Sequence, residues 1–372
     1  MSRRLIVAAL AAAVLAAGCA SSGGRPKPAA LQDFQPQLAA QPLWRSSVGT
    51  LNFSLTPALR GNTLVLAGSD GAVLALEAGS GRELWRASAG APLAAGVGSD
   101  GRFASVVSRD NELLTFEGGK LLWRQRLNSR VVTAPLVAGE RVFVLGVDRS
   151  VQAFDAIDGH QLWRLQRPGE PLTLLEPGVL APFKDTLLVG QGPRLAGVDP
   201  LQGSLRWEVA VALPRGSNEV ERLADLVGPA ARSGDVVCAR AFQSAVGCVD
   251  AQRATLLWAK NVGGIAPVGA DARQVFGADA SDRISAWNAA SGEVAWTSDK
   301  LLNRDLSGAL ALERAVVFGD AQGYVHFLSR DNGQTLQRLA TDGSAVVGTP
   351  LRAGDAVIVL TRKGGVFAFR PE

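Results

Sequence analysis

One short pattern returns through most of this 372-residue chain. It consists of an acidic residue or Asn, in most copies a Gly four residues later, and a Trp four residues after that, as in "AFDAIDGHQLW". The Trp residues of the series are spaced by 38 to 51 residues and comprise Trp44, Trp85, Trp123, Trp163, Trp207, Trp258 and Trp296. An eighth place falls in "DNGQTLQ", where Gln337 takes the Trp position. A repeat of about 41 residues is typical of propeller blades built from four antiparallel strands.

The segments between these copies have the character of strands. Runs such as "TLVLAG", "RVFVLG" and "AVVFGD" are rich in β-branched residues or Leu and end at Gly or Asp. The last unit contains only three such strands, whereas the first strand, around Trp44, has no unit before it. We therefore predict an all-β, eight-bladed β-propeller over residues 42–372, closed by the N-terminal strand joining the last blade. Closure removes the open sheet edge that would invite aggregation.

The repeated residues favour a structural role over a binding code. Gly permits a positive φ in the turn before the fourth strand. The acidic residue or Asn can accept hydrogen bonds from the turn backbone, and its type varies, with Glu77 and Asn288 in place of Asp. Trp is large and flat, so it can pack between adjacent blades while its N–H finds an acceptor. We expect Gln337 to mark a weaker contact between blades.

The first residues indicate export. "MSRR" is basic and "LIVAALAAAVLAAG" is apolar, which predicts a signal peptide over residues 1–18. "LAAGC" resembles a bacterial lipobox, in which Cys19 would carry lipid chains; the alternative is an ordinary signal peptide with an incidental Cys. Ala20, rather than Asp, favours the outer membrane under the sorting rule for such lipoproteins. Residues 19–41 are predicted to be the lipidated N-terminus and a flexible tether that spans roughly 25 Å.

Composition and motifs argue against several classes of function. The net charge of +4 comes from scattered Arg, so no nucleic-acid-binding stripe is predicted. His160 and His326 lie far apart in the chain, and the sequence contains no zinc-hydrolase, nucleophile-elbow or P-loop motif. We predict no catalytic residue, no metal and no cofactor. Cys238 and Cys248 flank a short turn as cross-strand neighbours, which leaves open a disulfide or two buried thiols.

Two families share features with this chain. The repeat resembles the tryptophan docking motif of the quinoprotein (PQQ-dependent) dehydrogenases, whose site needs an adjacent Cys–Cys pair that this sequence lacks. From Cys19 onward the chain resembles the BamB family, lipoprotein subunits of the β-barrel assembly machinery (BAM complex) of the outer membrane. The most specific similarities are "EPLTLLEPGVLAPFKDTLLVG" and "NEVERLADLVGPAA", of which the second lies in the longest gap between repeat Trp residues.

The BamB resemblance implies a scaffold without catalysis, anchored in the outer membrane and facing the periplasm. It implies that the two segments bind the POTRA domains of the barrel subunit BamA within the BAM complex, and that precursor barrel proteins bind transiently. Leu172 and Leu174 match the family's apolar loop positions and Asp225 matches the acidic one. The residues predicted to bind BamA are Leu172, Leu174, Leu175, Arg222 and Asp225. Leu175 stands where an Arg is common, and Val227 stands where a second acidic residue occurs, which favours the apolar part of the contact.

Three alternatives remain open at this level. The Leu residues at 172, 174 and 175 can simply pack under their loop. The propeller can be a quinoprotein-like (PQQ) enzyme. It can also be a stand-alone periplasmic lipoprotein that binds sugar or peptidoglycan.

Overall fold

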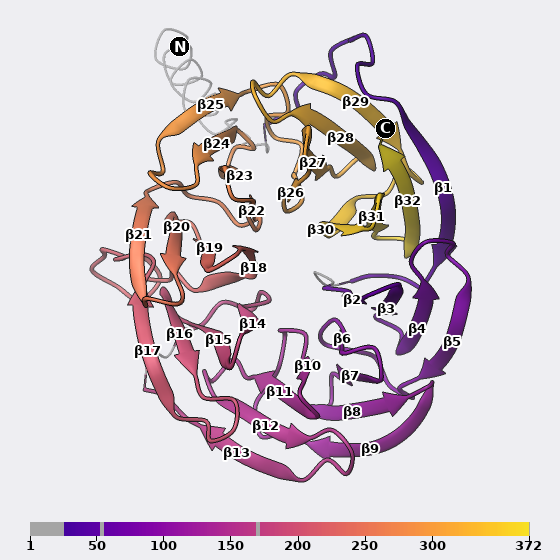
Figure 1. Cartoon of the computed structure of the whole chain (residues 1–372), viewed down its shortest axis with the longest axis vertical. Helices are drawn as coiled ribbons and strands as arrows, with labels where there is room; N and C mark the ends of the chain where they lie inside the picture. The colour runs from indigo at the N-terminus through magenta and orange to yellow at the C-terminus, as the bar shows by residue number, and fades with distance from the viewer. Residues whose placement is uncertain (1–25, 53–55, 169–171, 372) are drawn as a thin grey trace, which may run out of the picture.

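The computed structural model describes residues 26–52, 56–168 and 172–371, and all regular elements in these ranges are strands. None of these residues belongs to a helix long and apolar enough to cross a membrane. The predicted signal peptide and the lipid-attachment residue Cys19 lie outside the described ranges. The strands form a closed ring (Figure 1).

The ring contains eight four-stranded antiparallel sheets, which confirms the predicted eight-bladed propeller. We number the blades along the chain. Blades 1 to 4 are β2 (Ala58–Arg60), β3 (Thr63–Ala67), β4 (Ala72–Glu77) and β5 (Glu83–Ser88); β6 (Gly98–Ser99), β7 (Phe103–Val107), β8 (Glu112–Glu117) and β9 (Lys120–Arg126); β10 (Leu136–Ala138), β11 (Arg141–Leu145), β12 (Val151–Asp155) and β13 (Gln161–Leu165); and β14 (Leu180–Phe183), β15 (Thr186–Gln191), β16 (Arg194–Val198) and β17 (Leu205–Ala210). Blades 5 to 8 are β18 (Leu226–Ser233), β19 (Val236–Ala241), β20 (Ala245–Asp250) and β21 (Thr255–Lys260); β22 (Gly269–Ala270), β23 (Gln274–Ala278), β24 (Ile284–Asn288) and β25 (Val294–Ser298); β26 (Leu310–Ala311), β27 (Ala315–Gly319), β28 (Tyr324–Ser329) and β29 (Thr335–Ala340); and β30 (Val346–Ala353), β31 (Ala356–Thr361), β32 (Gly365–Pro371) and β1 (Ala40–Ser47).

The ring closes as the sequence predicts. β1 is the outer strand of blade 8 and pairs antiparallel with β32, with Trp44 opposite Ala368. The first and last strands of the domain therefore lie side by side in one sheet (Figure 1). Central strands are buried almost throughout, and apolar clusters fill the space between neighbouring blades. A single blade cannot cover both of its own faces, so the ring is the unit that is stable.

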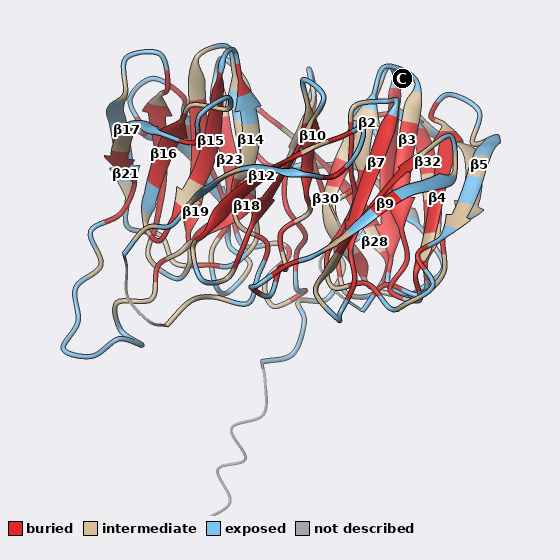
Figure 2. Cartoon of the chain, turned by 90° about the horizontal axis from the view of Figure 1, so that it is seen from below, coloured by how far each residue is buried: buried red, intermediate tan, exposed pale blue. Residues whose placement is uncertain are grey.

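The two rims of the ring carry different kinds of loop. In each blade the chain alternates direction, so the segments between blades share one rim with the turns between second and third strands. We call this rim the connection face; it includes the described residues of the connections 166–179, 211–225, 261–268 and 299–309. The opposite rim, the turn face, carries the turns before the outer strands, such as 156–160 and 199–204. The side view shows long connections projecting below the strands on one side of the ring only (Figure 2).

The repeated motif joins most blades to the next. The Trp258 Nε1–H donates to the Ala289 carbonyl at 2.8 Å, and a Cβ added at Gly292 (φ +69°) would meet the Trp258 ring at 2.6 Å. The same arrangement recurs in Trp44 with Gly81, Trp123 with Gly159, Trp163 with Gly203, and Trp296 with Gly333. The glycine therefore permits the turn and also makes room for the Trp of the preceding blade.

Three blade contacts depart from this rule. Between blades 1 and 2 the Trp85 ring lies farther from the glycine of the next turn, since a Cβ added at Gly119 would meet Trp85 Cβ at 3.3 Å. The turn that follows Trp207 has Ala254, with φ 54°, in place of Gly, and Trp207 instead lies against Gly197 of its own blade. At the eighth place, blade 8 has no turn between its third and fourth strands, because the chain ends after one and begins before the other. Here the Gln337 side-chain amide donates to the Leu38 carbonyl at 3.1 Å, so a smaller polar group replaces the Trp.

Part of the expected tether lies against the propeller. We call residues 29–38 the N-terminal strap. The Ala29 N–H donates to the Leu302 carbonyl at 2.8 Å, and the Gln37 N–H donates to the Leu336 carbonyl at 2.9 Å. Leu38 is buried in the apolar cluster between blades 7 and 8. Contact with the ring thus begins well before residue 41, where the sequence suggested that the tether ends.

A buried polar cluster holds the first residue of the strap. Arg304 Nη1 donates to the Ala29 carbonyl at 2.8 Å, and its Nη2 lies 2.7 Å from Asp320 Oδ2. His326 Nε2 lies 2.9 Å from the same carboxylate oxygen. Burial lowers the pKa of His326, although Asp320 opposes the shift. Burial alone would raise the pKa of Asp320, but hydrogen bonds from His326 and the Tyr324 backbone lower it. His326 is therefore a structural residue of the closure.

Candidate functional site

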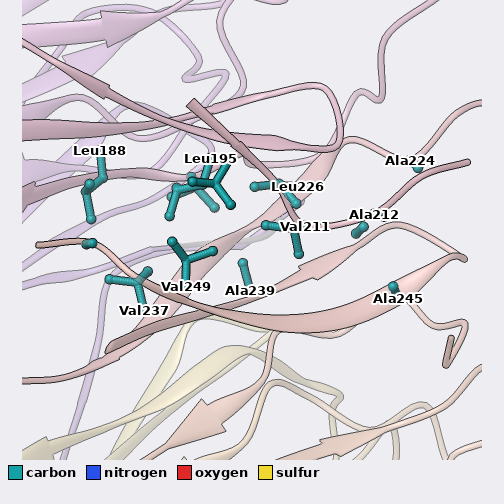
Figure 3. Packing of buried hydrophobic residues seen from close by; sticks show 14 of the residues in the cluster. Leu188, Leu195, Val211, Ala212, Ala224, Leu226, Val237, Ala239, Ala245 and Val249 are labelled. Atoms are coloured by element: carbon teal, nitrogen blue, oxygen red, sulfur yellow. The ribbon is translucent and has the colours of Figure 1, made fainter. Parts of the chain in front are cut away.

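Two neighbouring connections on the connection face contain the residues that the sequence singles out. The connection 211–225 is anchored at both ends, because Val211, Ala212 and Ala224 are buried in the cluster between blades 4 and 5 (Figure 3). Its middle part is open to solvent, with Leu213 78% and Val220 72% exposed. The apolar ends fix where the loop leaves the ring, and the middle forms a projecting surface.

Asp225 joins this connection to the one before it. Its Oδ2 accepts the Leu174 N–H at 2.7 Å, and its Oδ1 accepts Arg149 Nη2 at 3.3 Å. The same Arg149 nitrogen donates to the Leu172 carbonyl at 3.4 Å. The Asp225 and Arg149 side chains are 17% and 15% exposed, so water screens this pair less than it screens a surface ion pair. Groups from blade 3, the 166–179 connection and the start of blade 5 therefore converge here.

Backbone contacts make the same junction rigid. Gly178 forms an isolated antiparallel bridge with Val227, and the Gly228 N–H donates to the Pro177 carbonyl at 2.8 Å. A Cβ added at Gly228 would lie 2.0 Å from the Gly178 carbonyl oxygen. Only glycine allows the two backbone segments to approach this closely, so the end of the 166–179 connection is held to blade 5 over several residues.

The side chains around this junction differ in exposure. Leu172 and Leu174 are half-buried, whereas Leu175 is 56% exposed. Arg222 is half-buried, and its Nη1 lies 3.5 Å from the Gly216 carbonyl oxygen. A cavity of about 50 Å³ lies between Arg149, Leu174 and Asp225. Drug-sized ligands need cavities of about 300–1,000 Å³, so this junction suits a protein partner better than a small molecule.

Comparison with known proteins identifies the family. A family model described as "Outer membrane protein assembly factor BamB" matches residues 69–298. A BamB protein of Burkholderia pseudomallei is 37% identical over 370 residues, which cover 98% of this chain and 97% of that protein. The chain belongs to the BamB family.

Other members and structures are consistent with this assignment. BamB of Escherichia coli is 24% identical over 386 residues, covering 98% of each chain. The crystal structure of BamB from Moraxella catarrhalis superposes with a TM-score of 0.80 at 21% identity, over 89% of this chain and 100% of that one. A quinohemoprotein alcohol dehydrogenase from Comamonas testosteroni superposes with a TM-score of 0.65 at 14% identity, over 89% and 76%, which shows a shared fold.

The structure brings together the two BamB-like segments noted in the sequence. Asp225 binds the Leu174 N–H directly and is joined to the Leu172 carbonyl through Arg149, so its carboxylate organises the neighbouring loop. The two departures from the family pattern differ in kind. Leu175 is exposed, so it adds apolar surface where the resemblance led us to expect an Arg, whereas Val227 is only 4% exposed and offers no surface contact. Arg149 also belongs to this site, and no local sequence signal connects it with a partner 76 residues away.

Cys238 and Cys248 face each other across β19 and β20. Their sulfur atoms are bonded as a disulfide in the structure, with the Cα atoms 4.0 Å apart. Both residues are buried beside Trp258 in the cluster between blades 5 and 6. The disulfide lies within the strands of blade 5 and not at the junction. It therefore contributes to the scaffold that carries the connections.

Potential ligand groups elsewhere have structural explanations. Among the described residues, Asp155, Asp158 and His160 form a group whose ligand atoms lie within 4.8 Å of one another. Asp155 Oδ1 accepts the Ile157 N–H at 2.7 Å, as the turn of the repeat requires.

A larger cavity of about 400 Å³ opens on the turn face between blades 7 and 8, where Arg314, Arg352 and Arg370 are among the lining residues. It is the place to test the small-molecule alternative.

Proposed function

We propose that this chain is a non-enzymatic scaffold subunit of the β-barrel assembly machinery of the outer membrane. In this role it binds the POTRA domains of BamA through the junction of residues 172–175 and 211–225, and assists insertion of barrel proteins. Lipid chains on Cys19 hold it at the membrane, facing the periplasm. Membership of the BamB family supports the general role. The observation that carries the site is the rigid junction with Leu175 held out in solvent.

The physical argument rests on order and exposure together. An exposed apolar side chain is common on any protein surface. Here, however, the backbone that carries it is fixed by Asp225 and by the Gly178–Val227 bridge, so little conformational entropy is lost on binding. A partner that covers Leu175 and the exposed part of 211–225 gains apolar burial at low cost. Fixed apolar anchors of this type carry most of the energy of protein interfaces.

The proposal is tested by binding of the purified chain to the purified periplasmic domains of BamA. Leu175→Asp should weaken binding at least tenfold without changing the melting temperature, because this side chain is 56% exposed. Leu201→Asp is the matched control, since Leu201 is 62% exposed on the turn face. The double variant Leu172→Asp/Leu174→Asp should abolish co-purification of BamA. Unchanged binding by all of these folded variants would reject the proposed site.

The enzyme alternative has a direct test of its own. The fold shared with quinohemoprotein dehydrogenases supports testing it, although the sequence lacks their adjacent Cys pair. Titration with PQQ and calcium should give no absorbance change and no dehydrogenase activity. A stoichiometric change in absorbance would reject the scaffold proposal in its non-enzymatic form.

Crosslinking in cells, with identification of the partners, separates a BAM subunit from a stand-alone binder of sugar or peptidoglycan.

A further inference from the structure

Exposed apolar side chains are concentrated in one part of the connection face. Among the described segments between blades, large apolar residues are exposed only in three consecutive connections. They are Leu175 in 166–179, Leu213 and Val220 in 211–225, and Ile265 in 261–268. The proposed function accounts for the first two connections. Ile265, 58% exposed, lies on the third connection, which leads from blade 5 to blade 6.

A chain of hydrogen bonds links this third connection to the junction. The Phe242 N–H donates to the Asp225 carbonyl at 3.0 Å, while the carboxylate of Asp225 accepts the Leu174 N–H. The next residue, Gln243, donates its N–H to the Gly264 carbonyl at 3.0 Å. Each step crosses from one loop to the next. Ile265 is therefore part of the same connected surface as Leu174.

A buried arginine holds the backbone on both sides of Ile265. Arg240 Nη1 donates to the carbonyls of Val262 and Gly263 at 3.0 and 3.2 Å, and Nε donates to the Ala266 carbonyl at 2.7 Å. Its Nη2 donates to the Ala278 carbonyl of blade 6 at 2.7 Å. The side chain is fully buried.

The environment of this arginine is unusual. Each of its hydrogen bonds within the described residues goes to a backbone carbonyl, and no carboxylate there forms an ion pair with it. Burial lowers its pKa to about 10, so the group remains charged at neutral pH. Burying a charge is costly unless hydrogen bonds compensate it. The buried arginine therefore fixes the backbone of the 261–268 connection, and Ile265 is the exposed apolar side chain of that connection.

We propose that Ile265 is a third apolar anchor of the surface that binds the POTRA domains of BamA, and that Arg240 is the positioning residue that holds it there. This inference rests on the proposed function. It extends the interface across three consecutive connections. The occupant is the same partner, because the hydrogen-bonded chain makes the third loop continuous with the proposed junction.

Ile157 provides a matched control for the test. It is 54% exposed, close to the value for Ile265, but lies on the turn face. The dissociation constant of the full chain for the BamA periplasmic domains is measured for Ile265→Asp and Ile157→Asp. We expect about a tenfold increase for the first and no change for the second. Equal affinities for the two folded variants would overturn the proposal.

The same measurement with Leu175→Asp separates the two levels of the argument. If Leu175→Asp weakens binding while Ile265→Asp behaves like Ile157→Asp, the third anchor is wrong and the proposed function stands. If neither Leu175→Asp nor Ile265→Asp changes the affinity, the proposed function itself fails. If Leu175→Asp and Ile265→Asp both weaken binding while Ile157→Asp does not, the result supports the proposed function and the anchor at Ile265.

The positioning role is tested by a substitution in the loop that disturbs its contact with Arg240. Gly264 has φ +150°, and an added Cβ would lie 2.8 Å from Arg240 Nη1 and 3.0 Å from the Ala278 carbonyl oxygen, so Gly264→Ala must shift the loop relative to the Arg240 guanidinium. We expect Gly264→Ala to weaken binding severalfold. In this background Ile265→Asp should add much less than it does alone, since the anchor is already misplaced. If the losses in binding free energy from the two substitutions simply add, Arg240 does not position Ile265.

Discussion

Two parts of the connection face use similar chemistry to different ends. In the closure sector, residues 299–309 and 320–326, the buried Arg304 binds a carbonyl of the N-terminal strap. In this sector Leu301 and Leu306 are covered, at 2% and 7% exposed, and Leu302 is half-buried. In the site sector, which comprises the connections 166–179, 211–225 and 261–268, the buried Arg240 binds carbonyls of a connection. Apolar side chains there remain open to solvent.

The difference shows where the chain completes its own surface and where it does not. The closure sector is sealed by a segment of the same polypeptide, so its apolar groups contribute to folding. The site sector is held by the hydrogen bonds of Asp225 and Arg240, but no described segment covers Leu213 or Ile265. Rigid apolar surface without an internal cover is what a binding partner is expected to bury.

The largest effect should come from the buried carboxylate of the closure sector. Asp320→Ala leaves Arg304 and His326 buried without their partner, which should cost about 3–5 kcal/mol in free energy of unfolding. Urea denaturation measures the loss. Asp299→Ala removes an ion pair with Arg283 whose side chains are 56% and 52% exposed, and should cost less than about 1 kcal/mol. Similar losses for both variants would contradict the importance of the closure cluster.

The second prediction compares a covered with an uncovered leucine. Leu38→Ala should lower the free energy of unfolding by about 2–4 kcal/mol, because the side chain is 5% exposed between blades 7 and 8. Leu213→Ala, at a position 78% exposed, should change it by no more than about 0.5 kcal/mol. Thermal and urea denaturation of both variants give the answer. A large loss for Leu213→Ala would mean that the site sector serves stability.

The third prediction concerns pH. Burial lowers the pKa of His326 in the folded protein, so the unfolded chain binds a proton more readily near its ordinary pKa. Stability is therefore full above about pH 6.5 and falls as the pH decreases below it, by up to about 1.4 kcal/mol per pH unit. His326→Gln should remove this part of the slope between about pH 6.5 and 5 in urea denaturation. An unchanged slope in the variant would contradict the assignment.

The smallest effect on global stability should come from the site sector. Asp225→Ala removes the acceptor of the Leu174 N–H and should cost about 1 kcal/mol. Hydrogen exchange at the Leu174 amide should become at least several times faster, because the opening is local. Glu219→Ala, an exposed change in the 211–225 connection, should leave this amide unaffected. Equal exchange rates in the two variants would mean that Asp225 does not hold the loop.

The regular part of the fold was predictable because it repeats. The Trp spacing predicted eight blades, and the unpaired strand at Trp44 predicted how the ring closes. Gln337 was correctly placed at a Trp position, but its Leu38 partner depends on where the chain starts, which no local pattern encodes. Residues 172–175 and Asp225 were placed by family resemblance.

The supporting arginines were not predictable. Arg149 reaches Asp225 across 76 residues, and Arg240 reaches Ala278 across 38. Each is one of 38 Lys and Arg residues in the chain, and an Arg that binds distant backbone carbonyls leaves no periodic trace. The strap escaped prediction for a similar reason. Its composition is that of a linker, and its burial depends on a groove that only the assembled blades create.

The N-terminal strap also sets the direction in which the ring can be held. Its first hydrogen bond, from Ala29 to Leu302, lies on the connection face. Ala29 stands only ten positions after Cys19, and ten residues reach at most about 35 Å even when fully extended. With Cys19 lipidated as proposed, this attachment would keep the rim that bears the site sector within that distance of the bilayer.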